Sequence, residues 1–294
     1  MNARLRELLR LGRCGPVARP LSLFASRLRV PGAHLAAFSI LGKPRRGAVV
    51  VEVERENLRW VLDLRDDAQR LMFLNLYETQ LRQRVLDELS EGGTFVDVGA
   101  NVGFWSVPAA RRTGPAGRVL AFEPNPWAAG LLRRNVVANA GMSLASIEVL
   151  ETAVGREPGF AELFSWDMEA GSSRATLHRG AVPSKTAAHI NVPVTTIDEA
   201  IEGPVDVLKI DVEGHEAGVL AGASRLFAVS PPRRVVLEVH GGLLPHAGVD
   251  AEQLVAQVEA LGYRPVDGDG ALGHRHVSRP LPADFFETVV FARA

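Results

Sequence analysis

Cysteine is almost absent from the chain, since Cys14 is the single one among 294 residues. One thiol excludes an internal disulfide framework and a cysteine-rich zinc site, and it suits a reducing compartment. Long apolar runs are missing too: no stretch of about 18 apolar residues could cross a bilayer. The arginine-containing start lacks the apolar core and the cleavage site of a signal peptide. We therefore expect a cytoplasmic protein.

The chain also lacks an excess of charge of either sign. Its 33 Lys and Arg residues against 34 Asp and Glu residues give a net charge of -1, so no global field attracts nucleic acid and we expect no nucleic-acid partner. Residues 1–30 differ, with seven arginines and one acid. They could contact a membrane surface as an amphipathic helix, but their glycines and prolines interrupt that pattern. We expect a mobile or packed arm. The sequence does not indicate an oligomeric state.

What is present in quantity is apolar residues, 47% of the chain, enough to bury a substantial core. Apolar residues alternate over Val49–Val53 and Leu58–Leu64, which predicts a hairpin-like pair of strands. From Asp66 to Leu89 they recur at helical spacings without Gly or Pro, which predicts one amphipathic helix that ends at Gly92.

After residue 93 the pattern alternates between strand and helix. Continuous apolar strands such as Val205–Ile210 are typical of a parallel sheet with helices on both faces, so we predict a doubly wound α/β domain. The predicted strands are 94–98, 118–122, 147–154, 205–210, 233–239, 263–266 and 287–293, and the predicted helices are 104–112, 126–140, 216–227 and 251–261.

These patterns divide the chain into three parts. Residues 1–45 form the arm, residues 46–90 form strands and a helix that lead into the core, and residues 91–294 form the main domain. Within that domain, residues 155–197 are rich in Gly and Ser and too long for an ordinary connection. We interpret them as a substrate loop or a small hairpin.

The loop after the first core strand has the composition of a ligand-binding turn. It runs from Val96 to Gly103 and falls where doubly wound sheets bind their ligands, beyond the carboxyl end of a strand. Gly99 and Gly103 permit sharp turns and a close approach to a ligand, and Asn101 tolerates a positive φ. The next helix would direct its N-terminal N–H groups at a ligand carboxylate. A tight turn without a ligand is the other interpretation.

An acidic residue ends the second core strand. Glu123 lies twenty residues after Gly103, and its carboxylate could accept hydrogen bonds from both hydroxyls of a ribose. Dinucleotide enzymes share such an acid. The segment Gly99–Gly103 lacks their G-x-G-x-x-G spacing, however, which makes a nicotinamide-dependent oxidoreductase the second hypothesis. A cofactor-binding interaction protein without catalysis is the third.

Several segments together resemble the FkbM family of S-adenosylmethionine-dependent methyltransferases. The resemblance spans roughly Leu58 to Leu261 and leaves out the first forty residues and the tail after Tyr263. It rests on Val96–Gly103, Glu123–Pro126, Lys209–Glu216 and Glu238–His240, with Tyr77-Glu78, Ala153–Gly155 and Thr196–Asp198 in addition.

The resemblance implies a class I methyltransferase fold, a Rossmann-like, mostly parallel sheet with an antiparallel last strand. It also implies S-adenosyl-L-methionine as the cofactor and O-methylation of a hydroxyl on a sugar, polyketide or related metabolite, with a small-molecule or glycan acceptor. The predicted cofactor-binding residues are Asp97, Gly99, Ala100, Asn101, Gly103, Glu123, Pro124, Ala153, Val154 and Asp211.

Methyl transfer to a hydroxyl needs a group that takes the proton. Asp211 directly follows a core strand and is the first candidate, with Glu213 beside it. His240 ends the next strand and is the second candidate, because a neutral imidazole accepts a proton near pH 7. The acids could instead cap the helix that follows, and we expect His215 at its start to be a surface residue. We expect Lys209 to face inward and to be salt-bridged if it is buried, because an unpaired ammonium there would be costly.

A metal ion is a further alternative at these strand ends. Asp211, Glu213, Glu238 and His240 could form a cage of oxygen and nitrogen ligands. No spacing among them is diagnostic of a metal site, so we predict none.

Overall fold

The computed structural model describes residues 50–169, 172–182, 187–266, 281 and 285–294. The arm predicted at residues 1–45 lies outside the described residues, and the division of the chain near residues 45 and 90 stays a prediction. Within the described ranges, no helix is long and apolar enough to cross a membrane.

The described chain begins with the expected hairpin. Strands β1 (Val50–Arg55) and β2 (Leu58–Asp63) pair antiparallel through a two-residue turn. Glu56 and Asn57 in that turn have φ of 54° and 59°, the left-handed conformation that matches the twist of a hairpin. The side chain of Asn135 ties this hairpin to the core, since its Oδ1 accepts from Val61 N at 2.6 Å and its Nδ2 donates to Val102 O at 2.8 Å.

The prediction of a single helix over residues 66–89 is wrong. Two helices occupy the segment, α4 (Asp67–Leu74) and α5 (Thr79–Asp87). Asn75 ends α4 with φ of 60°, and its N–H bonds back to the carbonyls of the last turn. Because Asn tolerates this left-handed conformation, it can end a helix much as Gly does, and the apolar spacing on either side gives no sign of the break.

The main sheet has seven strands in the order β11-β12-β10-β9-β3-β4-β5. All neighbouring pairs from β10 to β5 are parallel, whereas β12 pairs antiparallel with both β10 and β11. The mostly parallel, doubly wound sheet with an antiparallel last strand is therefore confirmed. The strands are β3 (Thr94–Val98), β4 (Arg118–Phe122), β5 (Ser146–Leu150), β9 (Val207–Ile210), β10 (Arg234–His240), β11 (Tyr263–Val266) and β12 (Phe286–Arg293).

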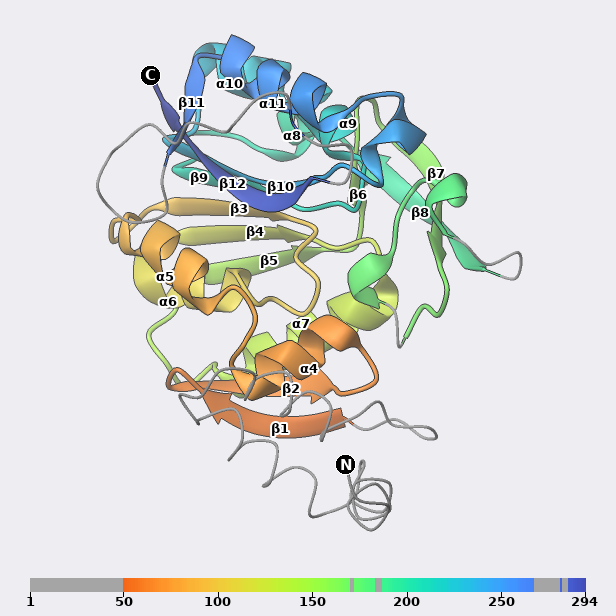
Figure 1. The fold of residues 1–294 in the computed structure, drawn as a ribbon. Coiled ribbons are helices and arrows are strands. Elements are labelled where there is room, and N and C mark those ends of the chain that lie inside the picture. The colour runs from red at the N-terminus through yellow and green to blue at the C-terminus, as the bar shows by residue number, and fades with distance from the viewer. Residues whose placement is uncertain (1–49, 170–171, 183–186, 267–280, 282–284) are drawn as a thin grey trace, which may run out of the picture.

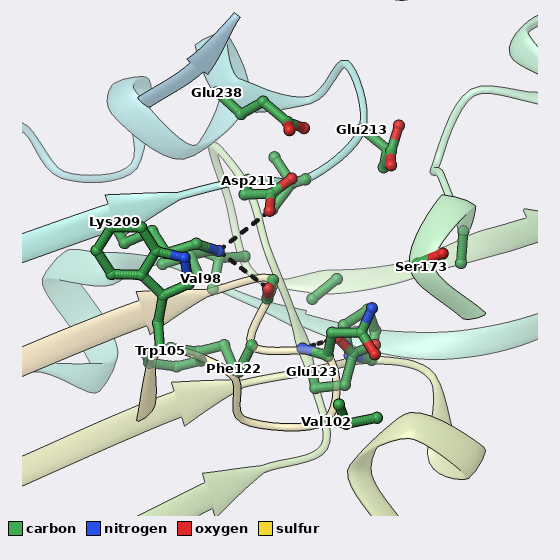
Figure 2. Close-up of a pocket in the computed structure, with 18 of the residues that line it drawn as sticks. Val98, Val102, Trp105, Phe122, Glu123, Ser173, Lys209, Asp211, Glu213 and Glu238 are labelled. Atoms are coloured by element: carbon green, nitrogen blue, oxygen red, sulfur yellow. Dashed lines mark hydrogen bonds and ion pairs between the residues drawn. The ribbon is translucent and has the colours of Figure 1, made fainter. Parts of the chain in front are cut away.

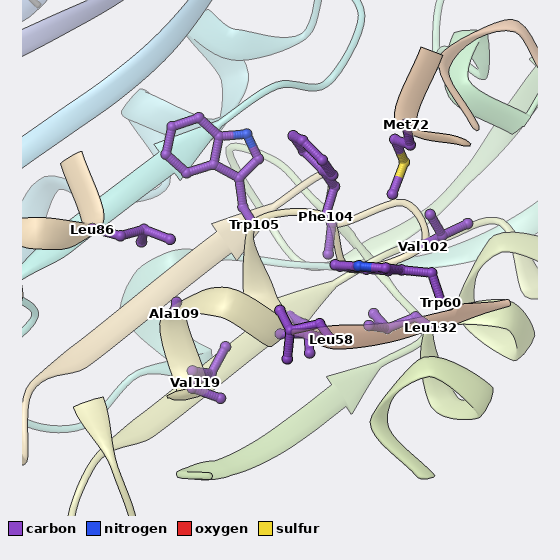
Figure 3. Packing of buried hydrophobic residues seen from close by; sticks show 14 of the residues in the cluster. Leu58, Trp60, Met72, Leu86, Val102, Phe104, Trp105, Ala109, Val119 and Leu132 are labelled. Atoms are coloured by element: carbon purple, nitrogen blue, oxygen red, sulfur yellow. The ribbon is translucent and has the colours of Figure 1, made fainter. Parts of the chain in front are cut away.

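Helices cover both faces of this sheet (Figure 1). Successive strand residues point to opposite faces. Phe95 therefore packs in the cluster with the helices of residues 67–138, and Val96 packs in the cluster with the helices of residues 197–260. Figure 3 shows the first cluster, where Trp60 from the hairpin meets Phe104 with ring centroids 6.2 Å apart. The further helices are α6 (Ser106–Thr113), α7 (Pro126–Ala138), α8 (Ile197–Ala200), α9 (Glu216–Ala221), α10 (Ser224–Val229) and α11 (Ala251–Ala260), so the helix predicted over 216–227 is two short ones.

The segment predicted as a substrate loop or small hairpin builds a second, three-stranded sheet. Its order is β6-β8-β7, with β6 (Ala153–Val154), β7 (Gly159–Ser165) and β8 (Ala188–Thr195). Strands β7 and β8 form an antiparallel pair that stands beside the carboxyl ends of the central strands (Figure 1). The connection between them includes two short 3-10 turns, Ser172–Arg174 and Arg179–Ala181.

Candidate functional site

A pocket opens at the carboxyl ends of the central strands (Figure 2). Val98 of β3, Phe122 of β4, Lys209 of β9 and Glu238 of β10 line it. This is the edge of a doubly wound sheet at which ligands bind, because loops diverge there and leave a crevice.

Most of the predicted site residues meet in this pocket. Asp97, Gly103 and His240 do not line it. Those that do are Gly99, Ala100, Asn101, Glu123, Pro124, Ala153, Val154, Asp211 and Glu213.

Close contacts within the protein require glycine at two positions of the loop. Gly99 has φ of 80°, and a Cβ there would lie 1.7 Å from the carbonyl oxygen of Asp211. A Cβ on Gly103, with φ of 87°, would lie 2.3 Å from Cδ1 of Leu132. We expected both glycines to permit close approach to a ligand. Within the protein, Gly99 lets the loop reach the neighbouring strand end, and Gly103 lets helix α7 pack against the loop.

Asp97 acts one layer behind the pocket. Its side chain is fully buried, and its Oδ2 accepts a hydrogen bond of 2.6 Å from Ser106 Oγ at the start of α6. Its Oδ1 lies 3.2 Å from Lys209 Nζ. The carboxylate therefore holds the start of the helix and the lysine in place.

Glu123 is a buried carboxylate that organises the loop. Its Oε2 accepts from Asn101 N and its Oε1 from Asn125 N, both at 2.8 Å. Burial raises the pKa of Glu123 to about 7, although these two hydrogen bonds oppose the shift. A carboxylate has about four acceptor sites, so further donors can still bind Glu123 from the pocket.

Lys209 lies between two carboxylates. Its Nζ is 3.2 Å from Asp211 Oδ2, 3.2 Å from Asp97 Oδ1 and 3.3 Å from the carbonyl oxygen of Gly99. Burial alone would lower the pKa of Lys209, but Asp211 and Asp97 raise it above its usual value. The lysine is therefore a buried, paired ammonium, as predicted from the cost of burying an unpaired charge.

Three carboxylates meet on one side of the pocket. Oxygens of Asp211, Glu213 and Glu238 all lie within 4.8 Å of one another, on the side away from Glu123 (Figure 2). Burial and the Asp211 carboxylate raise the pKa values of both Glu213 and Glu238 well above normal. The group includes three of the four residues considered as metal ligands, without His240.

Neither Asp211 nor Glu213 caps the following helix. The N-cap of α9 is His215, which makes no side-chain capping bond. Glu216 instead accepts from Val212 N at 3.2 Å and from Gly214 N at 3.0 Å through its Oε1. The capping alternative for the two acids is therefore wrong, and their side chains are left to line the pocket.

A family model described as the methyltransferase FkbM domain matches residues 97–265, more than half of the chain. This range holds the glycine loop, Glu123 and the three carboxylates that the fold brings into one pocket. The chain belongs to the FkbM methyltransferase family. As an FkbM protein, it is a methyltransferase whose cofactor is S-adenosylmethionine, and its doubly wound sheet is the class I methyltransferase fold.

The individual relatives share less than 30% sequence identity with this chain. Hexuronic acid methyltransferase AglP of Haloferax volcanii is 26% identical over 204 residues, 68% of this chain and 77% of AglP. Methyltransferase sdnD of Sordaria araneosa is 28% identical over 156 residues, 43% of this chain and 59% of sdnD. The crystal structure of methyltransferase FkbM from Methylobacillus flagellatus matches with a TM-score of 0.44 and 16% identity, over 77% of this chain and 55% of that chain. This chain thus spans less than two thirds of the latter two proteins.

The residues of this FkbM pocket fit the cofactor. Besides the free acceptor sites of Glu123, the buried Oδ1 of Asn101 has no hydrogen-bond partner among the described residues. Buried polar atoms are rarely left without a partner. The free acceptor sites of Glu123 and the Oδ1 of Asn101, whose backbone N–H bonds to Glu123, suit the two hydroxyl donors of a ribose.

Two histidines lie near the pocket, and His215 lines it whereas His240 does not. His240 packs edge-on against Phe286, with ring centroids 4.8 Å apart, and burial lowers its pKa. His215, predicted to be a surface residue, lines the pocket with its Nδ1 3.3 Å from His178 Nε2. Burial lowers the pKa of His215 to about 4, so the imidazole is neutral near pH 7.

The sequence assigned residues 155–197 to a substrate loop or small hairpin, but none of the residues by which this segment lines the FkbM pocket was predicted as a site residue. Ser173, Ala175 and Leu177 line it from the segment between β7 and β8. The residue between the last two, Thr176, donates to the carbonyl oxygen of Glu213 at 2.8 Å. The alternation of small or apolar with polar residues over 173–178 is a signal of an extended wall that could have been used. Met72 and Tyr77 add a second wall from the N-terminal helices.

Proposed function

We propose that this FkbM protein transfers the methyl group of S-adenosylmethionine to a hydroxyl oxygen of a sugar, polyketide or related metabolite. The observation that carries the proposal is the arrangement of one pocket, with Glu123 on one side and the Asp211 carboxylate on the other. The names of the relatives support it, because AglP is called a hexuronic acid methyltransferase.

In this proposal the cofactor side is formed by the loop and the acid after β4. Glu123 and Asn101 accept hydrogen bonds from the ribose hydroxyls, and backbone of residues 99–102 contacts the rest of the cofactor, with Pro124, Ala153 and Val154 beside it. When bound, the cofactor supplies an electrophilic methyl group on a sulfonium. Asp97 and Gly103 position this loop from behind the pocket.

On the acceptor side, Asp211 is the proposed general base. Its carboxylate takes the proton of the acceptor hydroxyl while that oxygen forms its bond to the methyl carbon. The carbon–sulfur bond breaks, and its electron pair stays on sulfur. Lys209 holds Asp211 in place through the 3.2 Å contact to Oδ2. Glu213 borders the acceptor, and His240 stays the second candidate, because it does not line the pocket.

Membership of the FkbM family excludes the nicotinamide-dependent oxidoreductase. The experiment therefore asks which atom of the acceptor is methylated. The test is to incubate the full chain with S-adenosylmethionine carrying a carbon-13 methyl group and a cell extract. Mass spectrometry should find products heavier by one labelled methyl, and their carbon-13 shift should be that of a methyl ether. Label on nitrogen, sulfur or carbon would contradict O-methylation. Calorimetry should show binding of S-adenosylhomocysteine and none of NAD.

A further inference from the structure

The pocket is lined by more acidic side chains than basic ones. Four acids line it, namely Glu123, Asp211, Glu213 and Glu238, and among its described lining residues Lys209 is the only Lys or Arg. The ammonium of Lys209 is already paired with Asp97 and Asp211. Arg174 stands nearby, but its side chain is 66% exposed and reaches toward Asp67 at 3.8 Å.

Glu238 is a buried acid that is crowded by two others. It is 8% exposed, and its carboxylate faces Asp211 and Glu213 across the pocket (Figure 2). Its carboxyl group hydrogen-bonds the carboxylate of Asp211, and burial raises its pKa well above normal. Ionising a buried carboxyl group beside other carboxylates is costly. A ligand that offers donors here would relieve that cost, whereas a ligand with its own negative charge would add to it.

Hydroxyl groups supply what this side of the pocket lacks. An O–H group that donates to a carboxylate makes a short, charge-assisted hydrogen bond, and adjacent hydroxyls can reach several of the clustered oxygens at once. A carboxylate or phosphate at the same place would add negative charge to three crowded carboxyl groups, which discriminates against it. The neighbouring wall lines the pocket with Ser173 and apolar side chains, and the guanidinium of Arg174, which acts on Glu213 from nearby, does not line the pocket.

We propose that the acceptor presents an uncharged, hydroxyl-rich unit, such as a neutral sugar ring, to Asp211, Glu213 and Glu238. The inference rests on the proposed function and narrows its acceptor. It separates this chain from AglP, which is named for a hexuronic acid. Glu238 and Glu213 then determine specificity by accepting hydrogen bonds from hydroxyls next to the one that is methylated.

The test uses matched sugar pairs that differ only at carbon 6, the methyl glycosides of glucose, galactose and mannose and the corresponding uronides. Saturation-transfer NMR on the full chain loaded with S-adenosylhomocysteine measures binding of each. At least one neutral glycoside should bind, with an affinity at least about tenfold higher than that of its uronide. Equal or tighter binding of the uronides, or no binding of any neutral member, would overturn the inference.

Variants test whether the cluster of Asp211, Glu213 and Glu238 causes the preference for neutral glycosides over uronides. Glu238→Gln and Glu213→Gln should each narrow the preference for the neutral glycoside, and Glu162→Gln, on the exposed face of β7, should leave it unchanged. A uronide that binds only with Mg²⁺, and not after chelation, would show that the carboxylates hold a cation and would overturn the inference. Failure of the proposed function has a different signature, namely no binding of S-adenosylhomocysteine by the unmodified chain.

Discussion

The ammonium nitrogen of Lys209 lies 3.2 Å from Oδ2 of Asp211. The same nitrogen lies 3.2 Å from the fully buried carboxylate of Asp97 on the neighbouring strand. One buried cation thus joins the residue that holds the start of α6 to the residue that we propose as the base. Lys209 thereby fixes the side chain of Asp211 at the rim of the pocket. The contact of Lys209 with the glycine loop is to the backbone carbonyl of Gly99.

Removing this cation should destabilise the fold. Lys209→Met leaves the buried Asp97 carboxylate without its counter-ion, and breaking a buried ion pair from one side typically costs about 3 to 5 kcal/mol. Denaturant unfolding measures the loss. The double variant Lys209→Met with Asp97→Asn should recover part of it, because the unpaired charge is gone. Equal stability of the single and double variants would contradict this role.

Glu123→Gln should weaken binding of S-adenosylhomocysteine by about 1.5 to 3 kcal/mol, the usual range for a hydrogen bond to a charged group. The amide keeps the size of the side chain but loses acceptor sites that the ribose would use. Isothermal calorimetry measures the change, and Glu148→Gln on the exposed side of β5 is the matched control. Unchanged affinity in Glu123→Gln would place the ribose elsewhere.

Gly99→Ala should lower the melting temperature and abolish cofactor binding together. The residue has φ of 80°, and its new Cβ would lie 1.7 Å from the backbone oxygen of Asp211, so the loop and the strand end must separate. Gly130→Ala in α7 is the control, because nothing lies within 4 Å of a Cβ there and Ala favours a helix by about 1 kcal/mol over Gly. A well-folded Gly99→Ala variant that binds the cofactor normally would contradict the close approach.

Glu216 should make stability depend on pH. Burial raises its pKa from 4.5 to about 7, so between these values the folded chain binds a proton that the unfolded chain has released. The stability that this group contributes is complete below pH 4.5 and is lost as pH rises through 7. Relative to Glu216→Gln, the unmodified chain should lose up to about 3 kcal/mol between pH 5 and pH 8. Parallel pH profiles of the two proteins would contradict the shift.

The sequence predicted those parts of the fold that depend on local pattern. Apolar strands and helical spacings placed the parallel sheet, and Glu123 was found because it ends a strand at a fixed distance from the glycine loop. The break at Asn75 escaped prediction, since one residue in a left-handed conformation leaves the apolar spacing on both sides intact. The split between α9 and α10 also escaped prediction, although it has no left-handed residue; it falls at Gly222 and Ala223, with φ of -82° and -116°.

Within the candidate site, the residues were easier to predict than their contacts. Lys209 was expected to be buried and paired, but only the fold shows that Asp97 is one of its partners. Gly99 was expected to approach a ligand, and the fold shows that it also approaches the backbone of Asp211, 112 residues further along the chain. His215 was expected on the surface, because a helix start is usually exposed. The contacts of Lys209 and Gly99 come from the register between β3 and β9, which sequence spacing does not determine.

The central claim is that Asp211 takes the proton of the acceptor, and a single-turnover measurement tests it most directly. The unmodified chain, Asp211→Asn and His240→Ala are each loaded with labelled S-adenosylmethionine and mixed with the acceptor identified from the extract. Asp211→Asn should slow methyl transfer by about 100 to 10,000-fold while its affinity for S-adenosylhomocysteine stays within a few fold. His240→Ala should transfer methyl at close to the normal rate, because that imidazole does not line the pocket. A normal rate in Asp211→Asn, or a large loss in His240→Ala alone, would contradict the account.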